Sequence, residues 1–118
     1  DQKILVNTVK SRDRIEDATL DRLTLSLRNS EGYDDLSFIR SLAIYGVYKG
    51  QEILLGDASI LSRGVTAVDL AIPDDLDFTP FVRAPTFTVL VRLGLAEDIE
   101  ESVSLKVSMS ATVDMDMY

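Results

Sequence analysis

The stretch from Val103 to Met117 alternates strictly between apolar and polar residues. Its odd positions hold Val103, Leu105, Val107, Met109, Ala111, Val113, Met115 and Met117, and its even positions hold Ser, Thr, Lys or Asp. Because successive side chains point to opposite faces of a strand, the pattern predicts a β-strand with one buried face. A one-residue slip would move Lys106 and Asp114 into the core, so burial fixes the register.

Similar β-rich runs occur along the rest of the chain and predict an all-β fold. We expect strands at Ile4–Val9, Leu23–Leu27, Ser41–Tyr48, Gln51–Leu55, Val68–Ile72, Phe87–Leu95 and Val103–Met117. The stretch from Asp13 to Leu23 admits a helix as an alternative, since Ile15 and Ala18 are three residues apart.

Turn chemistry separates these runs. Lys49 and Gly50 predict a hairpin turn, and Gly56 with Asp57 is expected to end the partner strand. Asn29 to Gly32 is expected to end the strand before it.

Two short helical turns are expected between strands. The first would follow Asp34 and Asp35, whose carboxylates can accept hydrogen bonds from the first free backbone amides. The second lies in the loop from Pro73 to Pro85, which holds all three prolines of the chain. There we expect Thr79 to cap a turn that Pro80 begins.

The order of these elements predicts one domain of residues 1–118 with two antiparallel sheets. About seven short strands and no long helix are typical of an immunoglobulin-like β-sandwich. The last two strands are expected to pair as a long hairpin. A different β-barrel, a jelly roll or a mixed α+β fold are the alternatives.

Charge and composition restrict the partners. Twenty acidic and twelve basic residues give a net charge of -8, which repels phosphate backbones and anionic membrane surfaces. No apolar run approaches the ~18 residues that span a bilayer. We therefore expect no nucleic-acid partner and no membrane insertion by this segment.

The residues that most enzymes need are scarce. The chain has no histidine and no cysteine, which excludes a Ser-His-Asp triad, thiolate chemistry and disulfides. We predict no catalytic, cofactor-binding or metal-binding residues, and no cofactor. A calcium site at Asp74, Asp75 and Asp77 is the alternative to a solvated loop.

The aromatic residues suggest one binding alternative. Tyr33, Tyr45, Tyr48 and Tyr118 could form a platform for stacking sugars, although Tyr45 and Tyr48 fall on opposite faces of one strand. A carbohydrate-binding accessory domain is therefore an alternative function.

The end of the alternating strand is the candidate functional segment. At ~3.3 Å per residue it would span about 50 Å, longer than a compact sandwich of this size needs. We expect the part up to Ala111 to be core. Either the strand bends, or Val113, Met115 and Met117 project and form a strand-pairing interface, through which the chain would form a homo-oligomer or bind another protein.

Several of these segments together resemble a known class of domain. Leu23 to Asn29, Leu36 to Ile39 leading to Tyr45, Leu76 to Phe81 followed by Phe87 to Val89, and the closing strand are similar to immunoglobulin-like domains of Bacteroidetes-type cell-envelope lipoproteins. The resemblance implies export to the periplasm or cell surface, with the signal or lipid-anchor segment absent from the chain, which begins at Asp1. A second likeness is to desiccation-related late-embryogenesis sandwich proteins, which implies an intracellular stress role.

The sequence thus predicts a non-catalytic cell-envelope module that acts in binding, spacing or assembly. Its protein or glycan partner is unknown from the sequence.

Overall fold

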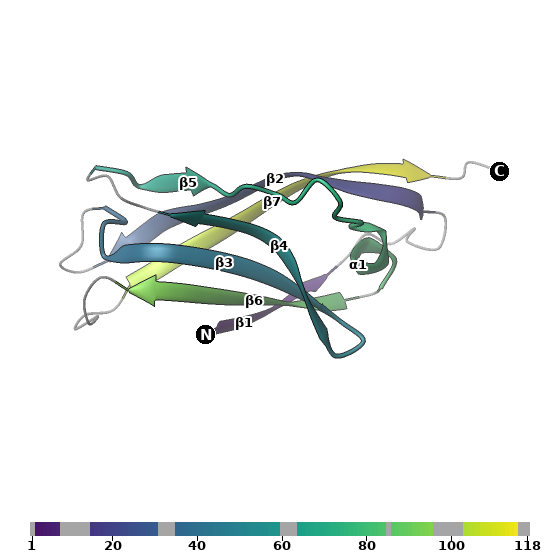
Figure 1. Cartoon of the computed structure of the whole chain (residues 1–118), viewed down its shortest axis with the longest axis horizontal. Helices are drawn as coiled ribbons and strands as arrows, with labels where there is room; N and C mark the ends of the chain where they lie inside the picture. The colour runs from purple at the N-terminus through teal and green to yellow at the C-terminus, as the bar shows by residue number, and fades with distance from the viewer. Residues whose placement is uncertain are drawn as a thin grey trace.

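The computed structural model describes residues 2–7, 15–30, 35–59, 64–84, 86–95 and 103–115. Two antiparallel sheets face each other (Figure 1), as the sequence predicts. The four-stranded sheet has the order β1-β6-β3-β4, with β1 at Gln2–Asn7, β6 at Thr86–Leu95, β3 at Ile39–Tyr48 and β4 at Gln51–Ser59. The three-stranded sheet has the order β5-β2-β7, with β5 at Ala67–Asp69, β2 at Ile15–Ser30 and β7 at Val103–Met115.

The core lies between the two sheets. Its fully buried side chains include Leu23 and Leu25 from β2, and Ile44, Leu55 and Val89 from the opposite sheet. Leu23, Leu25 and Ile44 alternate with exposed or half-buried neighbours along their strands, because side chains of a strand point alternately to its two faces. Leu55 and Val89 are each followed by another buried residue, Gly56 and Leu90. The period-two pattern of the sequence therefore identifies the inward faces of β2 and β3 correctly.

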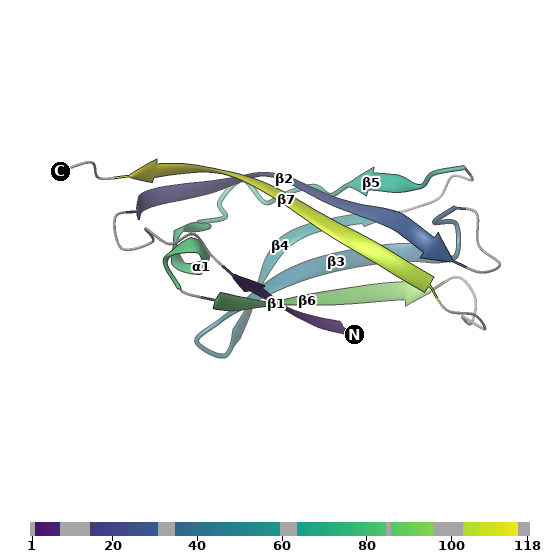
Figure 2. The same cartoon turned by 180° about the vertical axis from the view of Figure 1, so that it is seen from behind.

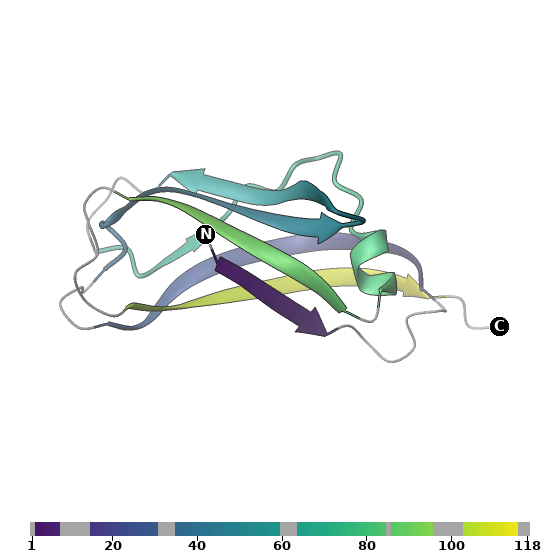
Figure 3. The same cartoon turned by 90° about the horizontal axis from the view of Figure 1, so that it is seen from below.

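One end of the sandwich is closed by the short helix α1 (Thr79–Arg83) (Figure 3). A cluster of aromatic rings packs around this helix. Phe81 of α1 is 0 % exposed. Its ring centroid lies 5.6 Å from that of Phe78, 5.3 Å from that of Phe87 and 6.1 Å from that of Tyr48. These spacings are typical of tilted and edge-to-face aromatic packing.

The prediction that Thr79 caps this helix is wrong. Phe78 is the N-cap residue, and its side chain accepts no hydrogen bond from the first backbone N–H groups of the helix. The Thr79 hydroxyl instead accepts a hydrogen bond from the Ala18 N–H of β2 at 3.0 Å and donates one to the Asp17 carboxylate at 3.0 Å. The hydroxyl that was expected to cap the helix therefore forms hydrogen bonds to strand β2 instead. The Asp77 carboxylate accepts the Thr79 N–H at 3.0 Å.

Strand β2 is longer than its partner β7 because it contains three extra residues. Strand β2 has 16 residues, of which 13 pair with the 13 residues of β7. The register skips Glu16, Asp21 and Arg28, which are all charged and exposed. Each extra residue forms a β-bulge, which increases the local twist and bends the strand.

These bulges explain the helix-like spacing that the sequence shows at the start of β2. Ile15, Ala18, Leu20 and Leu23 are all buried, with gaps of three residues wherever a bulge residue intervenes. The helical alternative over Asp13–Leu23 is therefore wrong from Ile15 onward, because the three-residue spacing comes from inserted residues in a strand.

The β2–β7 pair runs along the long axis of the molecule (Figure 2). The principal extents are 53 × 23 × 22 Å and the radius of gyration is 15.6 Å, against about 13.5 Å for an average compact domain of this length. The length of the alternating strand is therefore accommodated by an elongated sandwich.

The β3–β4 hairpin turns at Lys49 and Gly50 as predicted. Their φ angles of 51° and 78° are both positive, which is characteristic of a type I′ turn. Gly56 and Asp57 do not end β4, contrary to expectation. The register passes from Tyr45 opposite Leu54 to Ile44 opposite Gly56, so Leu55 is a bulge residue and the strand continues to Ser59.

One long edge of the sandwich is closed by the segment around β5. The Leu70 N–H donates to the Leu23 carbonyl of β2, while Ala71 and Asp57 of β4 exchange two backbone hydrogen bonds. A single segment therefore links both sheets. The segment before β3 is a turn and not the helical turn that the sequence predicts. The Asp35 carboxylate does accept backbone N–H groups, from Ser37 and Gly64, whereas Asp34 lies outside the described residues.

The predicted hairpin between the last two strands is wrong. Strand β6 pairs with β1 and β3, whereas β7 pairs with β2 in the other sheet. Both strands have one apolar face, and that pattern fits a connection within one sheet or between two sheets equally well.

Candidate functional site

Strand β7 presents an apolar stripe that the core only half covers. Leu105, Val107, Met109 and Val113 pack against the core and stay partly exposed, and Ala111 is exposed. Among the β7 side chains that the structure describes, none is fully buried. The expectation that the strand is core up to Ala111 is therefore met only in part, because the stripe packs against the core without full burial and Ala111 is exposed.

The outer edge of β7 carries no strand partner within the described ranges. The sheet order β5-β2-β7 places it last, and among the described strands β1, at the corresponding edge of the other sheet, pairs with β6 alone. Alternate N–H and C=O groups of an edge strand point away from its sheet, which makes the edge a template for another strand. This edge lies opposite the long side that β5 closes.

The outward face of β7 is polar. Ser104, Ser108, Ser110 and Thr112 form most of it. The Thr112 hydroxyl donates to the Asp21 carboxylate, which ties β7 to a bulge residue of β2. Lys106 and Asp114 are its only described charged residues and are both exposed.

The three residues predicted to form a strand-pairing interface are only partly described. Val113 lies opposite Ala18 of β2 and is half-buried against the core. Met115 lies opposite Ile15 in the same ladder. Met117 falls outside the described residues. The backbone of β7 is thus covered by its own domain along one edge as far as Met115.

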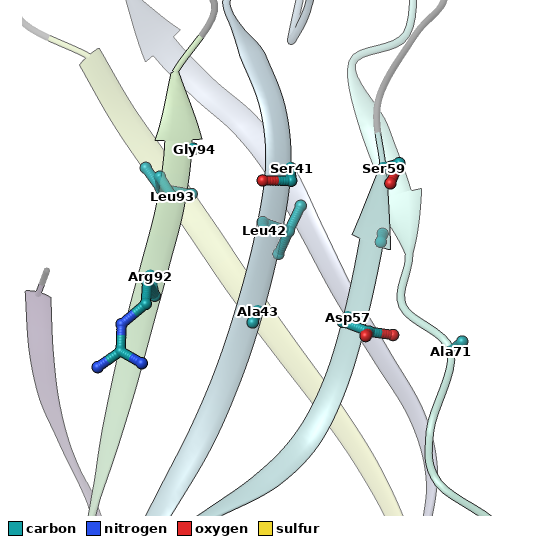
Figure 4. Close-up of a pocket in the computed structure, with 10 residues that line it drawn as sticks. Ser41, Leu42, Ala43, Asp57, Ser59, Ala71, Arg92, Leu93 and Gly94 are labelled. Atoms are coloured by element: carbon teal, nitrogen blue, oxygen red, sulfur yellow. The ribbon is translucent and has the colours of Figure 1, made fainter.

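A shallow hollow of about 650 Å³ lies on the outer face of the four-stranded sheet (Figure 4). Its floor is formed by small residues that face each other across β6, β3 and β4: Gly94, Ser41 and Ser59 in one row, and Ala43 in the next. Arg92 and Asp57 flank it, with their side chains pointing away from each other. The sequence analysis does not predict this hollow. Its signal in the sequence is the presence of small residues at outward positions of three strands.

Arg92 is held in place by its neighbours. Its guanidinium donates to the Glu52 carboxylate at 3.3 Å and lies 5.1 Å from the ring centroid of Tyr45. Tyr45 is on the outer face of β3, whereas Tyr48 contacts Phe81 at the core, so the prediction of opposite faces is confirmed. Within the described residues, the two tyrosines do not form a common platform.

The carboxylates of the described residues do not converge. No group of three acidic side chains in the described part of the chain could hold a metal ion, and the Asp77 carboxylate is bonded to the Thr79 backbone. The predicted calcium alternative at Asp74, Asp75 and Asp77 therefore gains no support. Over the described residues, no helix has the length and apolar character needed to cross a membrane.

An exposed ion pair ties β5 to β2. The Arg22 guanidinium donates to both oxygens of Asp69, at 3.2 and 3.1 Å, and the Thr24 hydroxyl donates to the same carboxylate at 2.6 Å. The hydrogen bond from Arg22, followed by that from Thr24, lowers the pKa of Asp69 below its ordinary value. Two-pronged pairing of this kind fixes geometry as well as charge.

This ion pair predicts an acid-sensitive contribution to stability. Because the Asp69 pKa is lower in the folded state, its contribution is complete above the unfolded value of about 3.9 and is lost as the pH falls through the folded value. We expect Asp69→Asn to have a lower urea midpoint than wild type at pH 6. Below pH 3 the difference between the two midpoints should become smaller. A difference that stays constant over this range would contradict the assignment.

No family model, no curated protein and no solved structure matches this chain.

Proposed function

We propose that the chain is a non-catalytic, immunoglobulin-like β-sandwich module of the cell envelope that acts in assembly. Its working surface is the outer edge of β7, which accepts a strand from a partner and extends the three-stranded sheet. The observation that carries this proposal is the edge position of β7, where a backbone edge without a partner among the described strands borders a half-buried apolar stripe. Hydrogen bonds between the two main chains would supply affinity, and the alternate side chains would supply specificity.

The length of the edge supports this function. Strand β7 runs for 13 residues, about twice the usual strand length. A long, regular edge is a hazard unless it is shielded by charges or bulges or used for pairing. Here the bulges of the ladder lie on β2 and leave β7 regular, and its outward face carries two charges over the described residues.

The hollow on the four-stranded sheet does not support catalysis. Arg92 and Asp57 at the hollow point apart, so they do not converge on a common substrate atom as the groups of a catalytic site must. Placement in the cell envelope rests on the resemblance to exported sandwich domains.

Binding of a generic β-strand peptide, followed by amide hydrogen exchange in β7, tests this function. The probe is a fluorescein-labelled peptide of five alternating threonine–valine pairs with lysines at both ends. We expect saturable binding by fluorescence anisotropy, together with slower exchange of alternate β7 amides, because only those on the outer edge gain a partner. The same peptide with two central prolines is the control and should not bind.

A pair of proline variants locates the binding edge. Val107→Pro and Ser108→Pro remove adjacent N–H groups, which point to opposite edges of β7. The variant that loses a bond to β2 should melt at a lower temperature. The other should keep the fold, since proline is tolerated on an outward edge, and lose the peptide. Unchanged β7 exchange at saturating peptide would overturn the proposal.

A further inference from the structure

We infer that the partner at the β7 edge is β7 of a second copy of this chain, paired antiparallel about a two-fold axis at Ser110. This inference rests on the proposed strand-accepting function and names its occupant. The two three-stranded sheets would then form one continuous sheet with the order β5-β2-β7-β7-β2-β5. Pairing of identical surfaces about a two-fold axis is the commonest way in which proteins form dimers.

Charge complementarity selects this register. With Ser110 opposite Ser110 of the second copy, Lys106 of each copy lies opposite Asp114 of the other. By symmetry the dimer contains two such pairs, which include all the described charged residues of the β7 outward face. The remaining outward pairs, Ser108 with Thr112 and Ser110 with itself, join hydroxyl groups. Opposite charges and hydroxyl pairs directly across strands are both favourable.

Other registers lack this match. A register centred on Lys106 or on Asp114 would place two like charges directly opposite each other, which is destabilising. One shift of two residues from the Ser110 register places Lys106 opposite Thr112 and Asp114 opposite Ser104. The other places Lys106 opposite Asp116 but leaves Asp114 opposite Ser108. Odd shifts would join the polar face of one strand to the apolar face of the other.

The inward face also fits. In the Ser110 register, Val107 lies opposite Val113 and Met109 lies opposite Ala111 of the second copy. These are the residues that the isolated chain leaves half-buried or exposed. Pairing would cover apolar surface that the sandwich itself does not, and methionine adapts well to such contacts.

Disulfide trapping tests the register. The chain has no cysteine, so a single introduced thiol reports one position. Directly opposite Cα atoms lie about 4.5–5.5 Å apart, within disulfide range. We expect Ser110→Cys to form a covalent dimer under mild oxidation. Ser108→Cys is the matched control, because the two copies of position 108 would lie about 13 Å apart and should not cross-link.

A mixture provides the positive control for that variant. Position 108 of one copy lies opposite position 112 of the other, so Ser108→Cys mixed with Thr112→Cys should give a covalent dimer of the two variants. A dimer from Ser108→Cys alone would show another register and would overturn the inference.

Charge reversal tests the complementarity in the native dimer. Lys106→Glu places acid opposite acid, and Asp114→Lys places base opposite base. We expect each variant to self-associate about tenfold more weakly than wild type in sedimentation equilibrium. An equimolar mixture of the two should recover association, because each mixed dimer regains two opposite-charge pairs. Failure of the mixture to recover it would overturn the register.

The outcomes separate this inference from the function on which it rests. A chain that is monomeric at millimolar concentration, and that does not cross-link through Ser110→Cys, overturns self-pairing. If the threonine–valine peptide still binds β7, the strand-accepting function stands and its partner is another protein. If the β7 amides of that monomer are already protected without peptide, a strand of the same chain occupies the edge and both proposals fail.

Discussion

Replacing Gly46 with alanine is expected to lower the free energy of unfolding by about 1–3 kcal/mol, as overpacking of a close-packed core does. A Cβ at this position would lie 2.5 Å from Cε1 and 2.8 Å from Cζ of Phe81. The ring cannot move aside, because Phe81 is 0 % exposed and lies against Phe78, Phe87 and Tyr48. Urea denaturation followed by circular dichroism measures the loss.

A compensating variant tests the cause. Phe81→Leu removes the ring atoms that approach Gly46, so Gly46→Ala should cost much less in that background than in wild type. This non-additivity is the signature of a direct contact. Equal costs in both backgrounds would show that the loss comes from the backbone of β3.

The second large effect is expected from Thr79→Val, which keeps the shape of the side chain and removes its hydroxyl. The Ala18 N–H would lose its acceptor and Asp17 its donor. Leaving a buried N–H without a partner costs about 1–3 kcal/mol. Because α1 meets β2 through this contact, hydrogen exchange at Ala18 should quicken along with the global loss of stability.

Thr79→Ser is the matched control, because it keeps the hydroxyl and removes only a methyl group. We expect it to keep the slow exchange of Ala18 and most of the stability. If the serine and valine variants lose equal stability, the hydrogen bonds contribute little and the prediction fails.

Strand β2 illustrates where sequence reasoning about the fold succeeds and where it fails. Leu23, Leu25 and Leu27 alternate with polar residues, and the strand that this pattern predicts is confirmed. Between Ile15 and Leu23 the buried residues are spaced by three and two, and no local rule distinguishes a bulged strand from a helix with that spacing. The bulges arise because β2 must follow the curvature of its ladder with β7, which is a tertiary requirement.

The candidate site shows the same division. The inward orientation of Val107 and Met109 follows from alternation alone. Their half-exposed state does not, because it depends on which strands flank β7, and pairing of β7 with β2 instead of β6 became evident only in the folded chain. Likewise, the outward small residues Ser41 and Gly94 form a hollow only because β3 and β6 are neighbours.

The alternation from Val103 to Met115 by itself determined that this segment is a strand, which of its faces is apolar and which register is allowed. These properties depend on the two-residue period of a strand, which is local. Only the tertiary structure decided that the strand lies at an edge, with its apolar face half covered and its outer backbone without a partner among the described strands. Sheet order depends on contacts between segments far apart in sequence, and side-chain alternation carries no information about which strand is the neighbour.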